Sequence, residues 1–242
     1  MEQLARLKVL EDTLDIEVSH ASDFRDRAIV SYRLTAKRDD LYLDLPYHNQ
    51  EHCEDVASIA VYLLDQVATE RGKDLQDQRL QEERIDLLIA ALFHGAGHND
   101  GELGDRDNLT QACNLVEGMF SDVLEADRVA RIKKLISHIG YPYVIPPSSL
   151  LGGILVDSDA IATSMRTCSV DTLLYGLLEE MNLKRIRKGL CPIEQHDFLE
   201  QQISFYKQTM GSLTTKVAKD LMQEYGLDTL IELQAHIGQY DD

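Results

Sequence analysis

Hydrophobic residues recur every three or four positions along most of the chain. One such series is Val56, Ile59, Ala60, Leu63, Leu64 and Val67, and another is Leu115, Val116, Met119 and Phe120. This spacing gathers apolar side chains on one face of an α-helix, and no comparable run shows the strict alternation of a strand. The pattern predicts an all-α protein with helices near residues 2–12, 22–38, 50–70, 80–94, 109–124, 126–139, 148–164, 169–187, 193–210, 213–225 and 227–236.

Glycine and proline clusters mark the connections between these helices, and none of them is long enough to separate two domains. The clearest breaks are residues 71–72, 101–104, 140–147 and 189–192. A chain of 242 residues can bury one full core. We therefore predict a single helical domain, in which residues 1–44 pack on a core of residues 45–165 and residues 166–242 complete it.

Two local signals refine this prediction. The segment Ile85 to Phe93, IDLLIAALF, is apolar nearly all round, which in a helix indicates burial on every side at the centre of the bundle. Pro146-Pro147 is followed by Ser148-Ser149, so a serine is placed to cap the next helix.

Charge narrows the choice of partners. Asp and Glu outnumber Lys and Arg by 42 to 24, which gives a formal net charge of −18. A chain this acidic repels nucleic-acid polymers and anionic membranes. The one basic cluster, Lys184, Arg185, Arg187 and Lys188, spans a helical turn. It suits an anion, but a solvated helix face explains it better.

The four cysteines, Cys53, Cys113, Cys168 and Cys191, lie far apart and show no paired spacing. That pattern indicates reduced thiols rather than a disulfide framework or a zinc knuckle. The segment MEQLARLKVLEDTLDIEV is charged from its first residues and lacks an apolar run suited to secretion or membrane insertion. We expect a soluble cytoplasmic protein.

Five of the eight histidines fall between residues 48 and 138, and four of these form two pairs. His48 and His52 are four residues apart at the start of a predicted helix, and His94 and His98 repeat that spacing at the end of the buried helix. Residues four apart share one helix face. One such pair is weak support for a site, because a single histidine on an apolar face is usually a core residue.

Asp157 and Asp159 directly follow a short apolar run in ILVDSDAIAT. A carboxylate is costly there unless a cation or hydrogen-bond donors compensate it. The plainer interpretation is that one aspartate caps the helix and the other faces water. Together with the two imidazole pairs, however, these carboxylates offer the nitrogen and oxygen ligands that one divalent ion needs.

The ordered segments YHNQEH, LIAALFHGAGH and LVDSDAIAT resemble the HD-domain superfamily of metal-dependent phosphohydrolases, including its cyclic-nucleotide-phosphodiesterase-like branch. The likeness covers roughly residues 45 to 165, and the order and spacing of the motifs are more specific than any one of them. It implies an HD-type helical bundle that hydrolyses phosphate esters.

Residue by residue, the resemblance implies that His52, His94 and Asp159 bind the metal. His48 would give the proton to the leaving oxygen. His98 corresponds to a second catalytic histidine, which supports another metal or a bridging water. Asp55 and Asp157 would orient the ligating imidazoles from behind.

The chain departs from the family pattern at Gly95. Family members carry aspartate directly after the second metal histidine, and that carboxylate binds the ion. Its absence predicts a weakly bound divalent ion, which could be Mn, Co, Ni, Fe, Zn or Mg. Asp100 or Glu102 would replace it only if the glycine-rich loop folded back.

Two further residues are candidates for substrate binding. Arg106 could clamp a phosphate, and its neighbour Asn108 is better explained as a helix cap. His138 lies late on a helix, so either it reaches the pocket or it is favoured by the negative end of that helix. The other histidines, His20, His196 and His236, fall outside the similar region and are expected at the surface.

Three functions are compatible with these residues. The first is a phosphomonoesterase or phosphodiesterase acting on a small nucleotide or similar metabolite, and the retained histidines favour it. The second is a degenerate HD-fold module that binds a ligand or assists assembly, and Gly95 favours it. A di-iron oxygenase ranks last, because only His138 lies between His98 and Asp159. The oligomeric state stays open.

Overall fold

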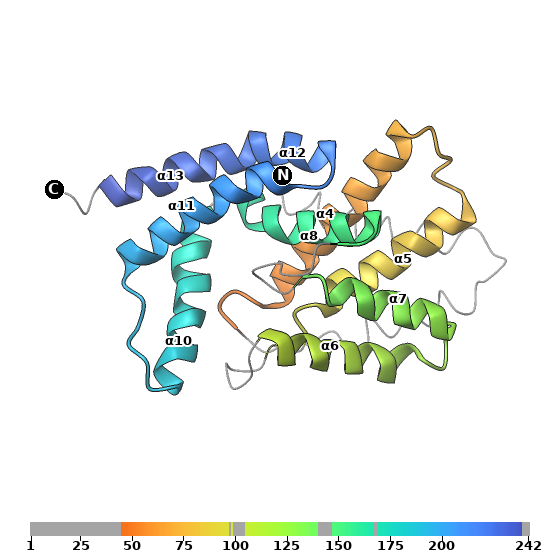
Figure 1. Cartoon of the computed structure of the whole chain (residues 1–242), viewed down its shortest axis with the longest axis horizontal. Coiled ribbons are helices and arrows are strands. Elements are labelled where there is room, and N and C mark those ends of the chain that lie inside the picture. Colours follow the sequence, from red (N-terminus) through yellow and green to blue (C-terminus); the bar gives the residue numbers. More distant parts are fainter. Residues whose placement is uncertain (1–44, 97, 99–104, 140–146, 167–168, 239–242) are drawn as a thin grey trace.

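The computed structural model describes residues 45–96, 98, 105–139, 147–166 and 169–238. Its described part is all-α and forms a single domain, as the hydrophobic pattern predicts (Figure 1). The predicted helices near 2–12 and 22–38 lie outside the described residues. The helices are α4 (Gln50–Glu70), α5 (Gln78–Phe93), α6 (Asp105–Phe120), α7 (Ala126–Ile136), α8 (Leu150–Ala162), η1 (Thr163–Met165), α9 (Ser169–Asp171), η2 (Thr172–Leu178), α10 (Glu179–Arg187), α11 (Gln195–Ser212), α12 (Lys216–Leu221), η3 (Met222–Gly226) and α13 (Leu227–Gly238).

The central helix α4 packs against both α5 and α8. Helix α7 packs on α5 and α6 packs on α7, so these helices build one end of the molecule, while α10, α11 and α13 lie at the opposite end (Figure 1). None of the helices in the described part is long and apolar enough to cross a membrane.

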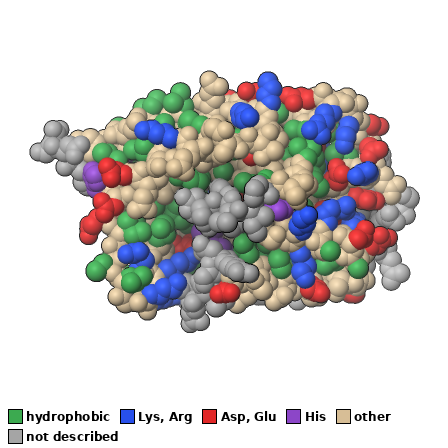
Figure 2. All heavy atoms as spheres, viewed as in Figure 1, with side chains coloured by type: hydrophobic (Ala, Val, Ile, Leu, Met, Phe, Trp, Pro, Cys, Tyr) green, Lys and Arg blue, Asp and Glu red, His purple; other side chains and the backbone are tan. Residues whose placement is uncertain are grey.

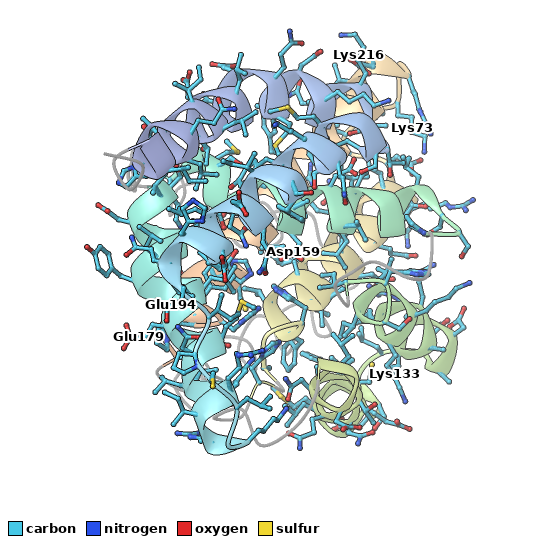
Figure 3. The ribbon with its side chains drawn as sticks, turned by 60° about the vertical axis from the view of Figure 1, so that its left-hand side comes forward. Lys73, Lys133, Asp159, Glu179, Glu194 and Lys216 are labelled. Atoms are coloured by element: carbon cyan, nitrogen blue, oxygen red, sulfur yellow. The ribbon has the colours of Figure 1, made fainter. Side chains whose placement is uncertain are left out.

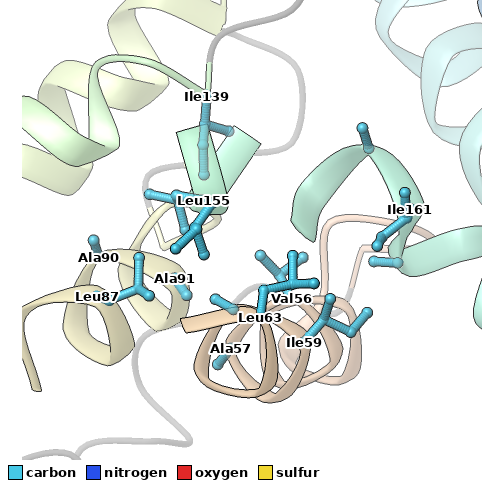
Figure 4. Packing of buried hydrophobic residues seen from close by; sticks show 14 of the residues in the cluster. Val56, Ala57, Ile59, Leu63, Leu87, Ala90, Ala91, Ile139, Leu155 and Ile161 are labelled. Atoms are coloured by element: carbon cyan, nitrogen blue, oxygen red, sulfur yellow. The ribbon is translucent and has the colours of Figure 1, made fainter. Parts of the chain in front are cut away.

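One hydrophobic core joins these helices. Val56 and Leu63 of α4 face Leu87 of α5 and Leu155 of α8 at its centre (Figure 4). Nearly every residue from Ile85 to Phe93 is buried, which confirms the prediction from the apolar segment. His94, which directly follows α5, is therefore held next to the middle of the core.

A buried ion-pair group holds α7 on α5. Asp86 is fully buried within the apolar segment of α5, and its carboxylate accepts hydrogen bonds from Arg128 and Arg131 of α7. Three of these bonds have lengths of 3.0, 2.6 and 2.6 Å. A buried carboxylate needs such partners, because an unpaired one would be strongly destabilising.

The ends of several helices test the finer predictions. Ser149 caps α8 by accepting a hydrogen bond from the Gly152 amide at 3.1 Å, as expected from the sequence. Helix α6 begins at Asp105, four residues before its predicted start, so the cap predicted at Asn108 is wrong. Two π-helical stretches, η2 and η3, interrupt helices that the sequence pattern reads as continuous.

Candidate metal centre

Three side chains far apart in the sequence meet near the middle of the bundle. His52 comes from the first turn of α4, His94 from the end of α5 and Asp159 from α8. Their ligand atoms all lie within 4.8 Å of one another. Asp159 lies well inside the ring of labelled surface side chains in Figure 3. Histidine side chains also show near the centre of the face in Figure 2, where acidic, basic and apolar side chains are interspersed around them.

The spacing of these atoms fits one ion. The Nε2 atoms of His52 and His94 are 3.4 Å apart. Asp159 Oδ1 lies 3.3 Å from His52 Nε2 and 3.8 Å from His94 Nε2. Two ligands at roughly 2.0–2.1 Å from a tetrahedral ion would be separated by about 3.4 Å. The three donors are therefore placed as a shared ion requires.

The protonation states also suit a metal. His94 Nδ1 donates to the Ala91 carbonyl at 2.6 Å. This leaves the lone pair of Nε2 free to bind an ion together with the ligand atoms of His52 and Asp159. Burial lowers the pKa of His94 to about 4, so its imidazole is neutral near pH 7. Burial alone would raise the pKa of Asp159, but the hydrogen bond from His52 and the neighbouring imidazoles hold that pKa below its usual value.

A second cluster lies beside the first. His48 Nδ1 is 2.8 Å from Glu180 Oε1, and the rings of His48 and His98 are stacked, with centroids 4.0 Å apart and an interplanar angle of 14°. His98 Nδ1 lies 4.0 Å from the same Glu180 oxygen. Burial lowers the pKa of His98 well below its usual range. His48 also contacts His52 edge to face at 5.7 Å, so the two clusters adjoin.

This second cluster is a poorer metal site than the first. The lone pairs of imidazole nitrogens lie in their ring planes, and one ion cannot lie in the planes of two nearly parallel stacked rings. Lys184 Nζ is 3.0 Å from Glu180 Oε1, where its positive charge opposes a cation. The arrangement suits proton transfer or an anion better. A third group, His196, Asp197 and Glu200, lies at the more exposed start of α11.

The two predicted supporting carboxylates have other partners. Asp157 accepts from the backbone amides of Thr214 and Thr215 and from the Thr215 hydroxyl, at 2.9 to 3.3 Å. Its carboxylate therefore anchors the start of α12 rather than an imidazole. Asp55 accepts from Arg166 Nε at 2.8 Å. Both aspartates of ILVDSDAIAT lie inside α8, so neither caps that helix.

The structure describes the side chain of one of the two candidates for substrate binding, His138, and not that of the other, Arg106. His138 is buried at the end of α7, and its ring packs against Gly152, where a β-carbon would lie 3.1 Å from His138 Cδ2. The side chain of Arg106 lies outside the described part of the chain. The prediction that Arg106 clamps a phosphate therefore stays a prediction.

Three residues of the second cluster were missed from the sequence. Glu180 is buried and also accepts from the backbone amides of Tyr47 and His48, at 3.2 and 2.9 Å. Asn108 is fully buried, with its Nδ2 3.5 Å from His98 Nδ1. Lys184, interpreted above as part of a solvated face, is half-buried against Glu180. The only sequence signal is that residues 180 and 184 continue the helical spacing of Leu173 and Leu177.

No protein-family model matches the chain, and no curated protein matches it significantly. The resemblance to HD-domain phosphohydrolases therefore stays a prediction. The geometry of the side chains is what indicates a function.

Proposed function

We propose that this protein is an HD-type metal-dependent phosphoric ester hydrolase that acts on a small nucleotide or a similar phosphate ester. The observation that carries the proposal is the convergence of His52, His94 and Asp159 within 4.8 Å, with 3.4 Å between the two imidazole nitrogens. Two imidazoles and one carboxylate with remaining open positions form the donor set of a hydrolytic metal centre.

Each residue has a distinct task in this proposal. His52, His94 and Asp159 would hold a divalent ion, which would supply Lewis-acid chemistry for the phosphate ester and for a water molecule. His48 gives a proton to the leaving oxygen from Nε2, because its Nδ1 is directed at Glu180. Glu180 fixes the orientation of that ring through this contact. His48 therefore faces the centre as an oriented acid.

The charge of the protein supports a small substrate. A net charge of −18 opposes a polyanion such as nucleic acid, whose binding depends on many cationic contacts. A single phosphate ester needs positive charge only at the site where its own negative charge is bound. The ion itself supplies that charge, and the ammonium of Lys184 beside Glu180 adds positive charge near His48 and His98.

The alternative function is a ligand-binding or assembly module with a degenerate centre. Gly95 favours it, because the chain offers no carboxylate directly after His94. With one anionic ligand, the ion would be held less firmly and its water activated less. Only the enzyme would hydrolyse its ligand repeatedly, so a measurement of turnover distinguishes the two functions.

The test is metal-dependent hydrolysis by the chelator-treated full chain. Reloaded with Mn, Co, Ni, Zn or Mg, the protein should hydrolyse at least one ester among aryl phosphates, nucleoside monophosphates and cyclic nucleotides. Asp159→Asn should abolish both metal binding and activity. His48→Ala should lower kcat by roughly a hundredfold or more, the usual contribution of general acid catalysis, and leave metal affinity unchanged.

His236→Ala is the matched control, because His236 is partly exposed on α13 and its Nδ1 contacts the Glu232 carbonyl of the same helix. It should change neither activity nor metal binding. If the folded, metal-loaded protein hydrolyses none of these esters, the enzyme proposal is wrong and the binding-module proposal takes its place.

A further inference from the structure

The residues that follow the two imidazole ligands touch each other. Cys53 follows His52 and Gly95 follows His94, and because the two imidazoles face each other, their chain neighbours meet as well. A β-carbon on Gly95 would lie 2.5 Å from Cys53 Sγ. Contacts that short do not occur between real side chains, so the sulfur and a side chain at position 95 exclude each other.

The sulfur has little room to move away. Cys53 is fully buried in α4, next to the core formed with α5. The backbone of Gly95 is within hydrogen-bonding reach of the sulfur, and burial raises the pKa of the thiol, which is therefore a neutral, inert group. Densely packed interiors resist added atoms. The obstacle at position 95 is steric, because positive φ among the described glycines is found only at Gly72 and Gly189.

We infer that Cys53 and Gly95 form a steric pair that limits the centre to three protein ligands, and that this three-ligand centre selects a tetrahedral ion such as Zn²⁺ or Co²⁺ over Mg²⁺. The inference rests on the metal centre of the proposed function. Position 95 is the chain neighbour of ligand His94, and Cys53 keeps any fourth ligand from entering there. Two imidazoles and one carboxylate suit a borderline ion, whereas Mg²⁺ prefers six oxygen ligands.

The steric part is tested without metal, by thermal unfolding in chelator of the wild type, Cys53→Ala, Gly95→Ala and the double variant. Gly95→Ala should lower Tm by roughly 3–10 °C when Cys53 is present, the range expected for overpacking a core in a chain of this size. In the Cys53→Ala background the same change should cost much less. Gly118→Ala is the control, because a β-carbon there meets nothing within 4 Å.

The metal part uses Co²⁺ as the probe, with titration calorimetry for affinity and the visible absorption for coordination number. The wild type should bind one Co²⁺ with the intense bands of a tetrahedral ion and should bind Mg²⁺ far more weakly. Cys53→Ala/Gly95→Asp should bind Co²⁺ at least tenfold more tightly than Cys53→Ala, with a spectrum of higher coordination. Gly95→Asp alone should not reach that affinity.

Three results would overturn the inference and leave the proposed function in place. The first is a Gly95→Ala penalty that is the same with and without the Cys53 sulfur. The second is a Gly95→Asp protein that binds Co²⁺ as tightly as the double variant. The third is a weak, six-coordinate Co²⁺ spectrum of the wild type. A wild type that binds no Co²⁺ at all would remove the proposed function together with the inference, and that result is distinguishable because the stability measurements need no metal.

Discussion

Replacement of Glu180 by glutamine tests whether the C-terminal helices hold the catalytic acid in place. Glu180 Oε2 accepts the backbone amides of Tyr47 and His48, and Oε1 faces His48 Nδ1 at 2.8 Å and Lys184 Nζ at 3.0 Å. If the glutamine oxygen takes the place of Oε2 and still accepts from the Tyr47 and His48 amides, its NH₂ group takes the place of Oε1. There it faces His48 Nδ1 and Lys184 Nζ. The substitution therefore spares the backbone contacts and removes the charged ones.

The magnitude follows from these contacts. A hydrogen bond to a charged group contributes roughly 1.5–3 kcal/mol, and the partly exposed Lys184 contributes less than the His48 contact. We expect Glu180→Gln to lower the free energy of unfolding by about 2–4 kcal/mol near pH 7. The pKa of Glu180 is held far below its usual value, mainly by His48 against the opposing effect of burial. This contribution is therefore complete above the unfolded pKa and fades only as pH falls through the folded one.

The assay is urea unfolding followed by circular dichroism in chelator, with kcat on an aryl phosphate as the functional measurement. Glu179→Gln is the matched control, because Glu179 is the exposed neighbour on the same helix (Figure 3). Glu180→Gln should also lower kcat without changing the affinity for Co²⁺, since His48 is not a metal ligand. Equal stability of the two variants, within about 0.5 kcal/mol, would refute the reasoning.

Three further outcomes are expected. Purified protein should contain less than one equivalent of transition metal by elemental analysis and lose it to a chelator, and stoichiometric metal that survives dialysis would contradict this. In chelator, His94 alone should lower the free energy of unfolding by about 3 kcal/mol as pH drops from about 6.5 to about 4, because the unfolded chain protonates this imidazole and the buried one, with its lowered pKa, resists. In urea titrations His94→Asn should lose this share of the pH dependence and keep the share that the buried His98 contributes. Asp157→Asn should lower Tm yet leave the Co²⁺ affinity unchanged, because its carboxylate holds the Thr214 and Thr215 amides that precede α12; a lost affinity would instead place Asp157 behind a metal ligand.

The sequence predicts the parts of the fold and site that local patterns encode. The helical spacing of apolar residues identifies α4, α5 and α8, and the apolar segment of α5 shows that His94 emerges from the core. The three proposed ligands follow from motif order, and the structure brings them together. Local patterns suffice here because each ligand has a recognisable position on its own helix.

Contacts between distant segments could not be predicted in the same way. Glu180 lies 132 residues from His48, in a helix rich in both charges, where an acidic residue usually faces water. Asp157 was assigned to an imidazole because nothing in the sequence indicates that the amides of Thr214 and Thr215 would need an acceptor. Hydrogen-bond partners are set by tertiary packing, which hydrophobic periodicity does not report.

The π-helical stretch η2 ends two residues before Glu180, and its Gly176 lies so close to the loop before α4 that a β-carbon there would be 3.1 Å from the Pro46 carbonyl oxygen. A π-turn takes up one residue more than an α-turn. Relaxing all seven residues of η2 to α-helix, with none deleted, would wind the chain further and rotate every later side chain of α10 by about 100°. Glu180 would then swing away from His48, although no residue of the centre had changed. The winding of η2 thus sets the phase of α10, so sequence changes in η2 that favour an α-helix could switch this chemistry off during evolution without altering the centre itself.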